Sequence, residues 1–115
     1  MDQAVILSTA RTPIGKAYRG TFNDTDAPTL ASFSIKASIE KADLDPSEIE
    51  DVILGAAVQQ GSQGYNIGRL SAISSGLPVH VPGMSVDRQC ASGLMAIAIG
   101  AKQIACKEMD VVVGG

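Results

Sequence analysis

The chain is poor in aromatic residues, which make up 3% of its 115 residues and include no tryptophan. A core without large rings must be assembled from Ile, Val, Leu, Ala and Met, within a hydrophobic fraction of 45%. A chain of this length fits one domain and can bury roughly two-thirds of the surface of its unfolded form. The sequence therefore predicts a single small domain, or part of one, in which small side chains dominate the packing.

Long hydrophobic runs and clusters of positive charge are also missing. No segment approaches the ~18 consecutive apolar residues of a membrane span, and the first residues lack the basic and apolar regions of a signal peptide. The formal net charge is -3, and the nine Lys and Arg residues are scattered. We therefore expect a cytoplasmic protein that binds neither membranes nor nucleic acid.

Cysteine occurs only twice, at Cys90 and Cys106. If the chain between them is helical, a rise of ~1.5 Å per residue separates their Cα atoms by about 24 Å, far beyond the limit of about 7 Å for a disulfide. The same distance rules out a metal ion shared by the two thiols. We therefore expect neither a disulfide framework nor a metal site.

Apolar, strand-like runs alternate with helix-like stretches along the chain. We expect strands near residues 4–9, 51–58, 83–87 and 110–115, and helices near residues 28–42, 66–75 and 91–107. Local signals support two of the helix starts: Pro28 suits a first turn, and the spacing from Asp45 to Glu48 marks a helix of about one turn. The order βαβαβαβ predicts an α/β fold with a mostly parallel sheet and helices on both faces.

The last part of the chain is strongly apolar. It closes on DVVVGG, a sequence typical of a fully buried interior strand. In the preceding helix Gly93, Ala96 and Gly100 fall along one side, where another helix is expected to approach closely; a helix buried within this domain alone is the alternative. We expect residues 1–115 to be an α/β domain, truncated after Gly115 and part of a longer protein.

Cys90 stands between the third predicted strand and the long helix. Ligands of open α/β sheets bind beyond the carboxyl ends of the strands, and a helix N-terminus favours a thiolate through its unpaired N–H groups and partial positive charge. Arg88 would add to that effect. Free cysteines are also often buried only for packing, so the position alone leaves open both a nucleophile and a core side chain.

Other residues give weaker signals. Cys106 falls in the last turn of the same helix, where the negative end of the dipole disfavours a thiolate, so we predict a structural thiol. His80 is the only histidine, and an extended strand would hold it roughly 20 Å from Cys90, which predicts a loop residue rather than a catalytic base. Arg69 is expected either to anchor a carboxylate or a neighbouring subunit, or to be solvated.

Two further features have simple structural interpretations. The segment GSQGYNIG lacks both the Lys-Ser/Thr pair of a phosphate loop and the dinucleotide-binding spacing, so its glycines are expected to serve turns. A group of acidic residues is expected to form a solvated surface with helix-capping roles. Its members are Glu40, Asp43, Asp45, Glu48, Glu50 and Asp51.

Taken together, four segments resemble the N-terminal part of the thiolase family, which comprises acetyl-CoA acetyltransferases and 3-ketoacyl-CoA thiolases. In chain order they are RTPIGK, GAAVQQGSQGYNIGRLSAISSGLP, VPGMSVDRQCASGLMAIAIGAKQI and DVVVGG. The segment RQCASGL around Cys90 is the most specific of them. The resemblance runs the length of the chain, implies a thiolase-like fold, and favours a nucleophile over a core side chain at Cys90.

The resemblance also implies a reaction. Acyl groups would be transferred to coenzyme A through a thioester on Cys90, cleaving a 3-ketoacyl-CoA or joining two acetyl-CoA in reversible Claisen chemistry. Acyl-CoA and coenzyme A would be the binding partners, no cofactor would be needed, and the complete protein would be a homo-oligomer, either a dimer or a tetramer.

Several catalytic parts of the family have no counterpart in this sequence. They are the His of its G-H-P motif, its Asn-containing motif and the second Cys of its C-x-G motif, so the 115 residues alone are expected to be inactive. Two alternatives stay open. One is a non-catalytic half-domain that associates with another chain, and the other is a ketosynthase-like member of the same superfamily.

Overall fold

The structure, a computed structural model, describes residues 3–115. Three helices and three strands alternate along it, together with two single turns of 3-10 helix. The elements are α1 (Ala27–Lys41), η1 (Pro46–Glu48), β1 (Asp51–Gly55), η2 (Gly61–Gln63), α2 (Ile67–Ser74), β2 (Gly83–Val86), α3 (Ser92–Ala105) and β3 (Val112–Gly114). All three predicted helices and the last three predicted strands are therefore present, with ends that differ by a few residues.

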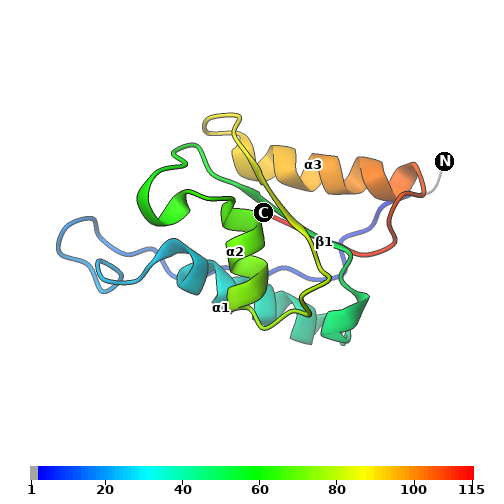
Figure 1. Cartoon of the computed structure of the whole chain (residues 1–115), viewed down its shortest axis with the longest axis horizontal. Coiled ribbons are helices and arrows are strands. Elements are labelled where there is room, and N and C mark those ends of the chain that lie inside the picture. Colours follow the sequence, from blue (N-terminus) through cyan, green and yellow to red (C-terminus); the bar gives the residue numbers. More distant parts are fainter. Residues whose placement is uncertain (1–2) are drawn as a thin grey trace.

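The strands form one parallel sheet in the order β2-β1-β3. Helices α1 and α2 lie on one side of this sheet and α3 lies on the other, as Figure 1 shows. β1 and β2 are each followed by a helix that carries the chain back to start the next parallel strand, which is the arrangement that a parallel sheet requires. The predicted α/β fold with helices on both faces is confirmed.

Local signals explain where the helices begin. The Asp26 carboxylate caps α1 by accepting a hydrogen bond from the Thr29 N–H at 2.9 Å, and Pro28 occupies the first turn. Asp45 and Glu48 form the predicted capping box around η1: the Glu48 carboxylate accepts from the Asp45 N–H at 2.7 Å, and the Asp45 carboxylate accepts from the Ser47 N–H at 2.8 Å. These starts depend only on neighbouring residues, which is why the sequence reveals them.

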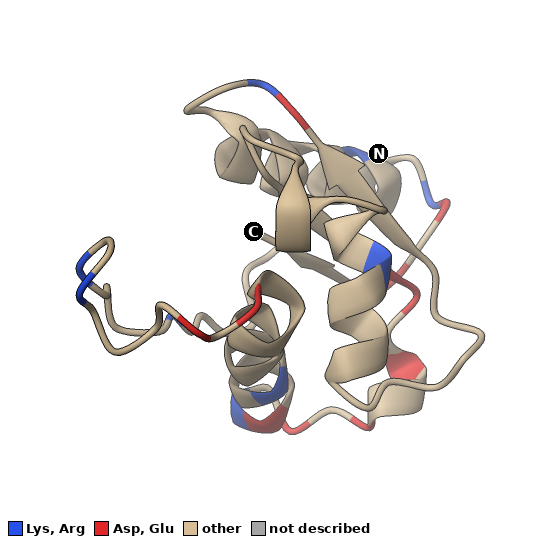
Figure 2. Cartoon of the chain, turned by 60° about the vertical axis from the view of Figure 1, so that its left-hand side comes forward, with Lys and Arg blue, Asp and Glu red and all other residues tan. Residues whose placement is uncertain are grey.

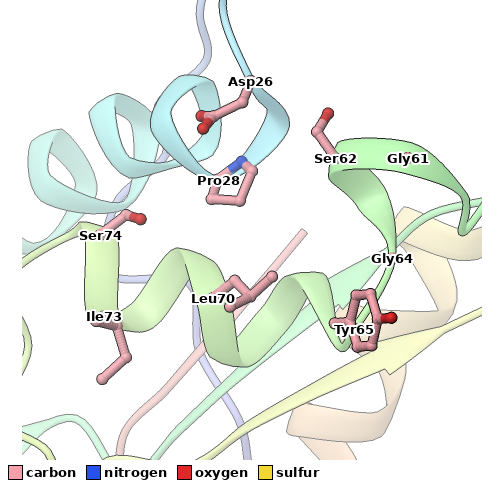
Figure 3. Close-up of a pocket in the computed structure, with 9 residues that line it drawn as sticks. All are labelled: Asp26, Pro28, Gly61, Ser62, Gly64, Tyr65, Leu70, Ile73 and Ser74. Carbon is pink, nitrogen blue, oxygen red and sulfur yellow. The ribbon is translucent and has the colours of Figure 1, made fainter.

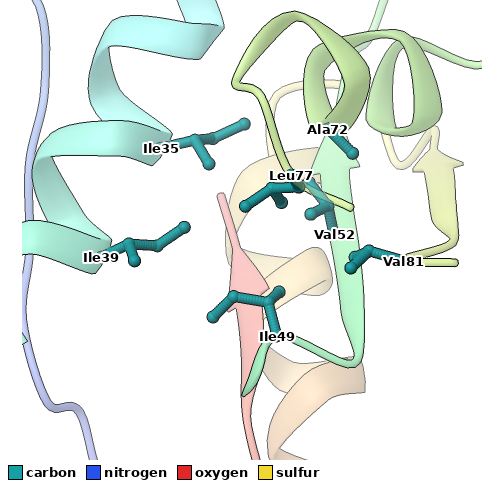
Figure 4. Close-up of a cluster of buried hydrophobic side chains, with 7 residues drawn as sticks. All are labelled: Ile35, Ile39, Ile49, Val52, Ala72, Leu77 and Val81. Carbon is teal, nitrogen blue, oxygen red and sulfur yellow. The ribbon is translucent and has the colours of Figure 1, made fainter. Parts of the chain in front are cut away.

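The main core lies between the sheet and the pair α1 and α2 (Figure 4). Ile35 and Ile39 project from α1 toward Val52 of β1, and Ala72 projects from α2. The complete buried cluster is Ile35, Ile39, Ile49, Val52, Ala72, Leu77 and Val81. Burial of each larger aliphatic side chain stabilises the fold by about 1.5–3 kcal/mol, so a core without aromatic rings is sufficient to hold these layers together.

Helix α3 packs closely on the other face of the sheet. A Cβ added at Gly100 would lie 2.6 Å from Cγ2 of Val112 in β3, and Ala96 has no exposed surface. The expectation that the small side of this helix receives another helix is therefore wrong, because within the described chain that side meets the strands. On the outer side of α3, Leu94 is 72% exposed and Ile97 is 43% exposed.

The predicted first strand is not found. Residues 4–9 form no strand, and their apolar side chains Val5, Ile6 and Leu7 are mostly exposed. Two hydrogen bonds attach this segment to α1, from Ser8 Oγ to the Ser38 carbonyl and from Lys41 Nζ to the Thr9 carbonyl. A run of aliphatic and β-branched residues gives a segment strand propensity, but a strand also needs a pairing partner, and none of the described strands pairs with this one.

Two further strand predictions need correction. β3 is half-buried rather than fully buried, because it lies at one edge of the three-stranded sheet. β1 ends at Gly55 and not at residue 58, since Gly55 lies against the backbone of the first turn of α3. Neither the order of strands in a sheet nor a contact across its layers can be read from local sequence.

Charged positions are distributed along the loops and α1, with Lys and Arg interspersed among Asp and Glu (Figure 2). Asp51 departs from the predicted solvated acidic surface, because it is only 6% exposed at the start of β1. Its burial raises the pKa of the carboxyl group, while a hydrogen bond from the Val52 N–H acts in the opposite direction. Within residues 3–115, every helix is too short or too polar to cross a membrane.

Candidate functional site around Cys90

Cys90 lies on the turn that connects β2 to α3, the yellow loop next to the first turn of α3 in Figure 1. Its side chain is exposed, so it is not a core residue in the described chain. α3 begins two residues later, with Ala91 as an N-cap that provides no side-chain hydrogen bond. The Ala91 and Ser92 N–H groups donate to the Arg88 and Gln89 carbonyls, so what the helix start offers Cys90 is chiefly its partial positive charge.

The backbone of this turn has an unusual conformation. Gln89, directly before Cys90, has a φ of 51°, in the left-handed region that non-glycine residues seldom occupy. Its N–H donates to the Asp87 carboxylate at 2.9 Å, and the Ala91 N–H donates to the Arg88 carbonyl at 3.1 Å. Such a conformation persists only where the surroundings hold it, so the turn that presents Cys90 is constrained.

Ser92 closes the turn from the helix side. Its hydroxyl accepts a hydrogen bond from the Arg88 N–H at 2.8 Å and donates one to the Gln89 carbonyl at 2.6 Å. The side chain is buried, whereas Asp87, Arg88, Gln89 and Cys90 around it are exposed. One buried hydroxyl therefore ties together the two residues that precede Cys90.

Gly55 fixes the first turn of α3 against the sheet. A Cβ at this position would lie less than 3.0 Å from backbone atoms of both Ser92 and Gly93, so only glycine allows β1 and α3 to approach this closely. The Cys90 turn consequently lies near the carboxyl ends of β1 and β2, the edge where open parallel sheets bind ligands. The sequence predicted this edge for Cys90, and the structure confirms the placement.

Asn66 attaches β2, the strand leading to Cys90, to the start of α2. Its amide nitrogen donates to the Gly83 carbonyl at 2.8 Å, and its amide oxygen accepts from the Arg69 N–H and the Ser85 hydroxyl. The sequence placed Asn66 only at a helix start. Its N-cap role was a local signal, but its link to β2 spans 17 residues and was not predictable.

The remaining predicted residues do not join Cys90. His80 is exposed in the turn before β2, at the opposite end of that strand, which confirms a loop histidine. Cys106 is the C-cap of α3, at the far end of the helix, and its side chain is exposed rather than packed. Arg69 donates through its guanidinium to the Val79 and Val81 carbonyls, so it holds a loop instead of anchoring a carboxylate.

Two surface hollows of about 420 Å³ each lie elsewhere. The first is formed by the start of α1, η2 and α2, and Leu70, Ile73 and Tyr65 line it (Figure 3). The second lies beside α1, with Phe22 and Phe33 in its lining. Cys90 lines neither hollow, and within residues 3–115 no group of three or more His, Cys, Asp or Glu residues is arranged to bind a metal ion.

Comparison with known proteins identifies the family. Residues 4–115 match the family described as thiolase, N-terminal domain. The chain is 39% identical over 115 residues to an acetyl-CoA acetyltransferase of Cupriavidus necator, covering 100% of this chain and 29% of the relative. It is 41% identical over 113 residues to the peroxisomal 3-ketoacyl-CoA thiolase 5 of Arabidopsis thaliana, covering 98% of this chain and 25% of the relative.

A solved structure agrees with these sequence relatives. A thiolase from Ascaris suum in complex with coenzyme A superimposes with a TM-score of 0.91 at 32% identity, over 98% of this chain and 29% of that one. The chain thus spans less than a third of the length of the proteins that it matches. Sequence and fold lead to the same conclusion: the chain belongs to the thiolase family and corresponds to its N-terminal domain.

Proposed function

We propose that the complete protein is an acyltransferase that moves acyl groups to and from coenzyme A, with Cys90 as the residue that carries the acyl group. The observation behind this proposal is the exposed position of Cys90, on a constrained turn at the N-terminus of α3. The relatives support the same chemistry, since they are named acetyl-CoA acetyltransferase and 3-ketoacyl-CoA thiolase, and one solved thiolase contains coenzyme A.

In the degradative direction, the Cys90 thiolate attacks the keto carbon of a 3-ketoacyl-CoA, and negative charge develops on the keto oxygen. The bond from the keto carbon to the adjacent α carbon then breaks, which leaves the shortened acyl group on Cys90 as a thioester. The departing α carbon takes up a proton and leaves as acetyl-CoA. A second coenzyme A gives up its thiol proton to a base, attacks the thioester, and departs as the new acyl-CoA.

Residues of this chain contribute to the first of these steps. The start of α3 places a partial positive charge beside Cys90, which stabilises both the thiolate and the developing oxyanion. His80 lies at the opposite end of β2 from Cys90, so we propose that the acid and the base come from outside these 115 residues. Coenzyme A thioesters are the substrates, and no other cofactor enters the scheme.

Trapping the acyl-enzyme tests the proposal. The complete protein, mixed with acetyl-CoA in the absence of free coenzyme A, should gain the mass of one acetyl group on the peptide that contains Cys90. The Cys90→Ser variant should gain none, because a serine hydroxyl is a weak nucleophile without a base tuned to it. The Cys106→Ser variant should acylate normally, and acylation that persists without Cys90 would show that another residue is the nucleophile.

Alkylation separates the two cysteines without any substrate. Both side chains are exposed, so access alone does not distinguish them, but they lie at opposite ends of α3 and of its dipole. Cys90 should therefore react faster with iodoacetamide at neutral pH, as peptide mapping after a short exposure would show. Equal labelling, or faster labelling of Cys106, would contradict the assigned role of the helix N-terminus.

The exposed outer side of α3 supports a second candidate, a non-catalytic domain that associates with another chain. Leu94 and Ile97 form an apolar surface of the kind that drives association, and the expected homo-oligomer would also need such surfaces. The acylation experiment discriminates between the two functions. A complete protein that associates but never acylates Cys90 would favour the association domain.

A further inference from the structure

We infer that Ser92 is a positioning residue for Cys90: its buried hydroxyl holds the left-handed turn at Gln89 and thereby keeps the Cys90 thiol at the N-terminus of α3. The inference rests on the proposed function, since a positioned thiol matters only if it reacts. It adds a residue that does not itself touch the substrate.

The hydroxyl of Ser92 makes two hydrogen bonds to two different residues of the turn. It accepts from the Arg88 N–H and donates to the Gln89 carbonyl, and these two residues follow the end of β2 at Val86 by two and three positions. Both bonds involve backbone groups, so they fix the path of the chain rather than a side chain. Alanine at position 92 would remove the partner of the Arg88 N–H and leave the Gln89 carbonyl with only the bond from the Ser92 N–H, at 3.1 Å.

The conformation of Gln89 depends on this support. A φ of 51° is unfavourable for a residue with a side chain, so the turn should relax toward a common conformation once the Ser92 hydroxyl is removed. Cys90 follows Gln89 directly, so any relaxation at Gln89 moves the thiol. A displacement of about 1 Å at a reacting group can lower a rate by as much as 100-fold.

The helix itself has other support. Gly55 packs against the backbone of Ser92 and Gly93, and the Met95 N–H donates to the Ala91 carbonyl at 2.9 Å to begin α3. Neither interaction uses the Ser92 hydroxyl. Removal of the hydroxyl should therefore disturb the turn before Cys90 more than it disturbs the fold.

Ser32 in α1 provides a matched control. Both serines are 4% exposed, and each hydroxyl donates to the carbonyl three residues earlier, at 2.7 Å for Ser32 and 2.6 Å for Ser92. Ser32→Ala should thus impose a similar loss of a buried hydrogen bond in an element remote from Cys90. A general effect of destabilisation would appear in both variants, whereas a positioning effect would appear only in Ser92→Ala.

The test measures the rate of Cys90 alkylation against pH in the complete protein. In Ser92→Ala the rate at neutral pH should fall about tenfold, because the thiol leaves its position at the helix N-terminus. Turnover should show a matching loss in kcat with little change in KM. Ser32→Ala should leave the profile and both kinetic constants near the wild-type values.

A double variant keeps the inference testable if Ser92→Ala does not fold. Glycine adopts the left-handed conformation readily, so a Gln89→Gly variant should need the Ser92 hydroxyl less. Adding Ser92→Ala to Gln89→Gly should therefore slow the alkylation of Cys90 less than Ser92→Ala does in the wild-type protein. Failure of the double variant to fold would show that Ser92 serves folding and not the thiol. A folded Ser92→Ala protein with a wild-type profile would overturn the inference as well.

The two readouts separate this inference from the proposed function. Alkylation requires no acyl transfer, so the role of Ser92 can be judged even if acetyl-CoA leaves no adduct on wild-type Cys90. In that case the missing adduct would reject the proposed function, while the alkylation rates would still test the role of Ser92. An adduct on wild-type Cys90, combined with an unchanged profile in Ser92→Ala, would reject the inference alone.

Discussion

Replacement of Gly55 by alanine should disturb the junction between β1 and α3. The added Cβ would lie less than 3.0 Å from backbone atoms of Ser92 and Gly93, whereas ordinary contacts begin at 3.4 Å. The strand and the helix must therefore move apart by more than 0.4 Å. Because the obstructing atoms are backbone on both sides, no change of rotamer can relieve the contact, and we expect a loss of about 1–3 kcal/mol in the free energy of unfolding.

Urea unfolding of the complete protein measures this loss, and Cys90 alkylation reports on the displaced turn. Gly93→Ala is the control, because it lies in the same turn of α3 but the nearest atom to its added Cβ is 3.5 Å away. Alanine there should be neutral or stabilising by up to about 1 kcal/mol, since glycine is a poor helix former. If Gly55→Ala is as stable as wild type and its Cys90 reacts at the same rate, the close approach of β1 and α3 is wrong.

Two other positions give predictions on stability. Asp51→Asn should be more stable than wild type at pH 7, because burial raises the pKa of Asp51 and so disfavours its charged form. The difference in stability should disappear as the pH falls below about 4, where the Asp51 carboxyl group is protonated in the unfolded chain as well. Thermal unfolding across this pH range checks the sign, and a wild type that gains on the variant as the pH rises would contradict it. Asn66→Ala should cost about 1–2 kcal/mol, since it removes a helix cap and the bond to Gly83 at a residue with a φ of 65°. Asn66→Gly should cost less if the left-handed backbone is the larger part of the effect, and chemical denaturation of the two variants measures the difference.

Elements with local signals were predictable from the sequence. The Asp45 to Glu48 capping box and Pro28 in the first turn of α1 depend only on residues a few positions apart, and both appear as expected. The strand-like segment at residues 4–9 carries an equally clear local pattern but forms no strand. Propensity is a property of the segment, whereas pairing depends on which strands the fold places beside it.

The small residues of α3 show the same limit for packing. Their spacing correctly indicated a face that allows close approach, but it did not indicate what approaches. The chain connection after the helix places Val112 of β3 against Gly100, so the sheet fills the space that a second helix was expected to occupy. A periodic pattern gives the direction of a face, and only the topology gives its neighbour.

The candidate site combines both kinds of information. Cys90 could be placed at a strand-to-helix junction from the order of elements alone, and its neighbours in the sequence carried the family resemblance. The constraint on its turn could not be predicted in this way. A left-handed conformation is usually indicated by glycine or asparagine, but here the residue is Gln89, and Ser92 resembles any serine at a helix start. The Ser92 hydroxyl is buried at a point where Gly55, 35 residues before Cys90, lets β1 pack against the first turn of the helix. A larger residue at position 55 would lift that turn from the sheet and open the Ser92 hydroxyl to water, so the geometry of the thiol depends on a residue in a strand to which Cys90 does not belong.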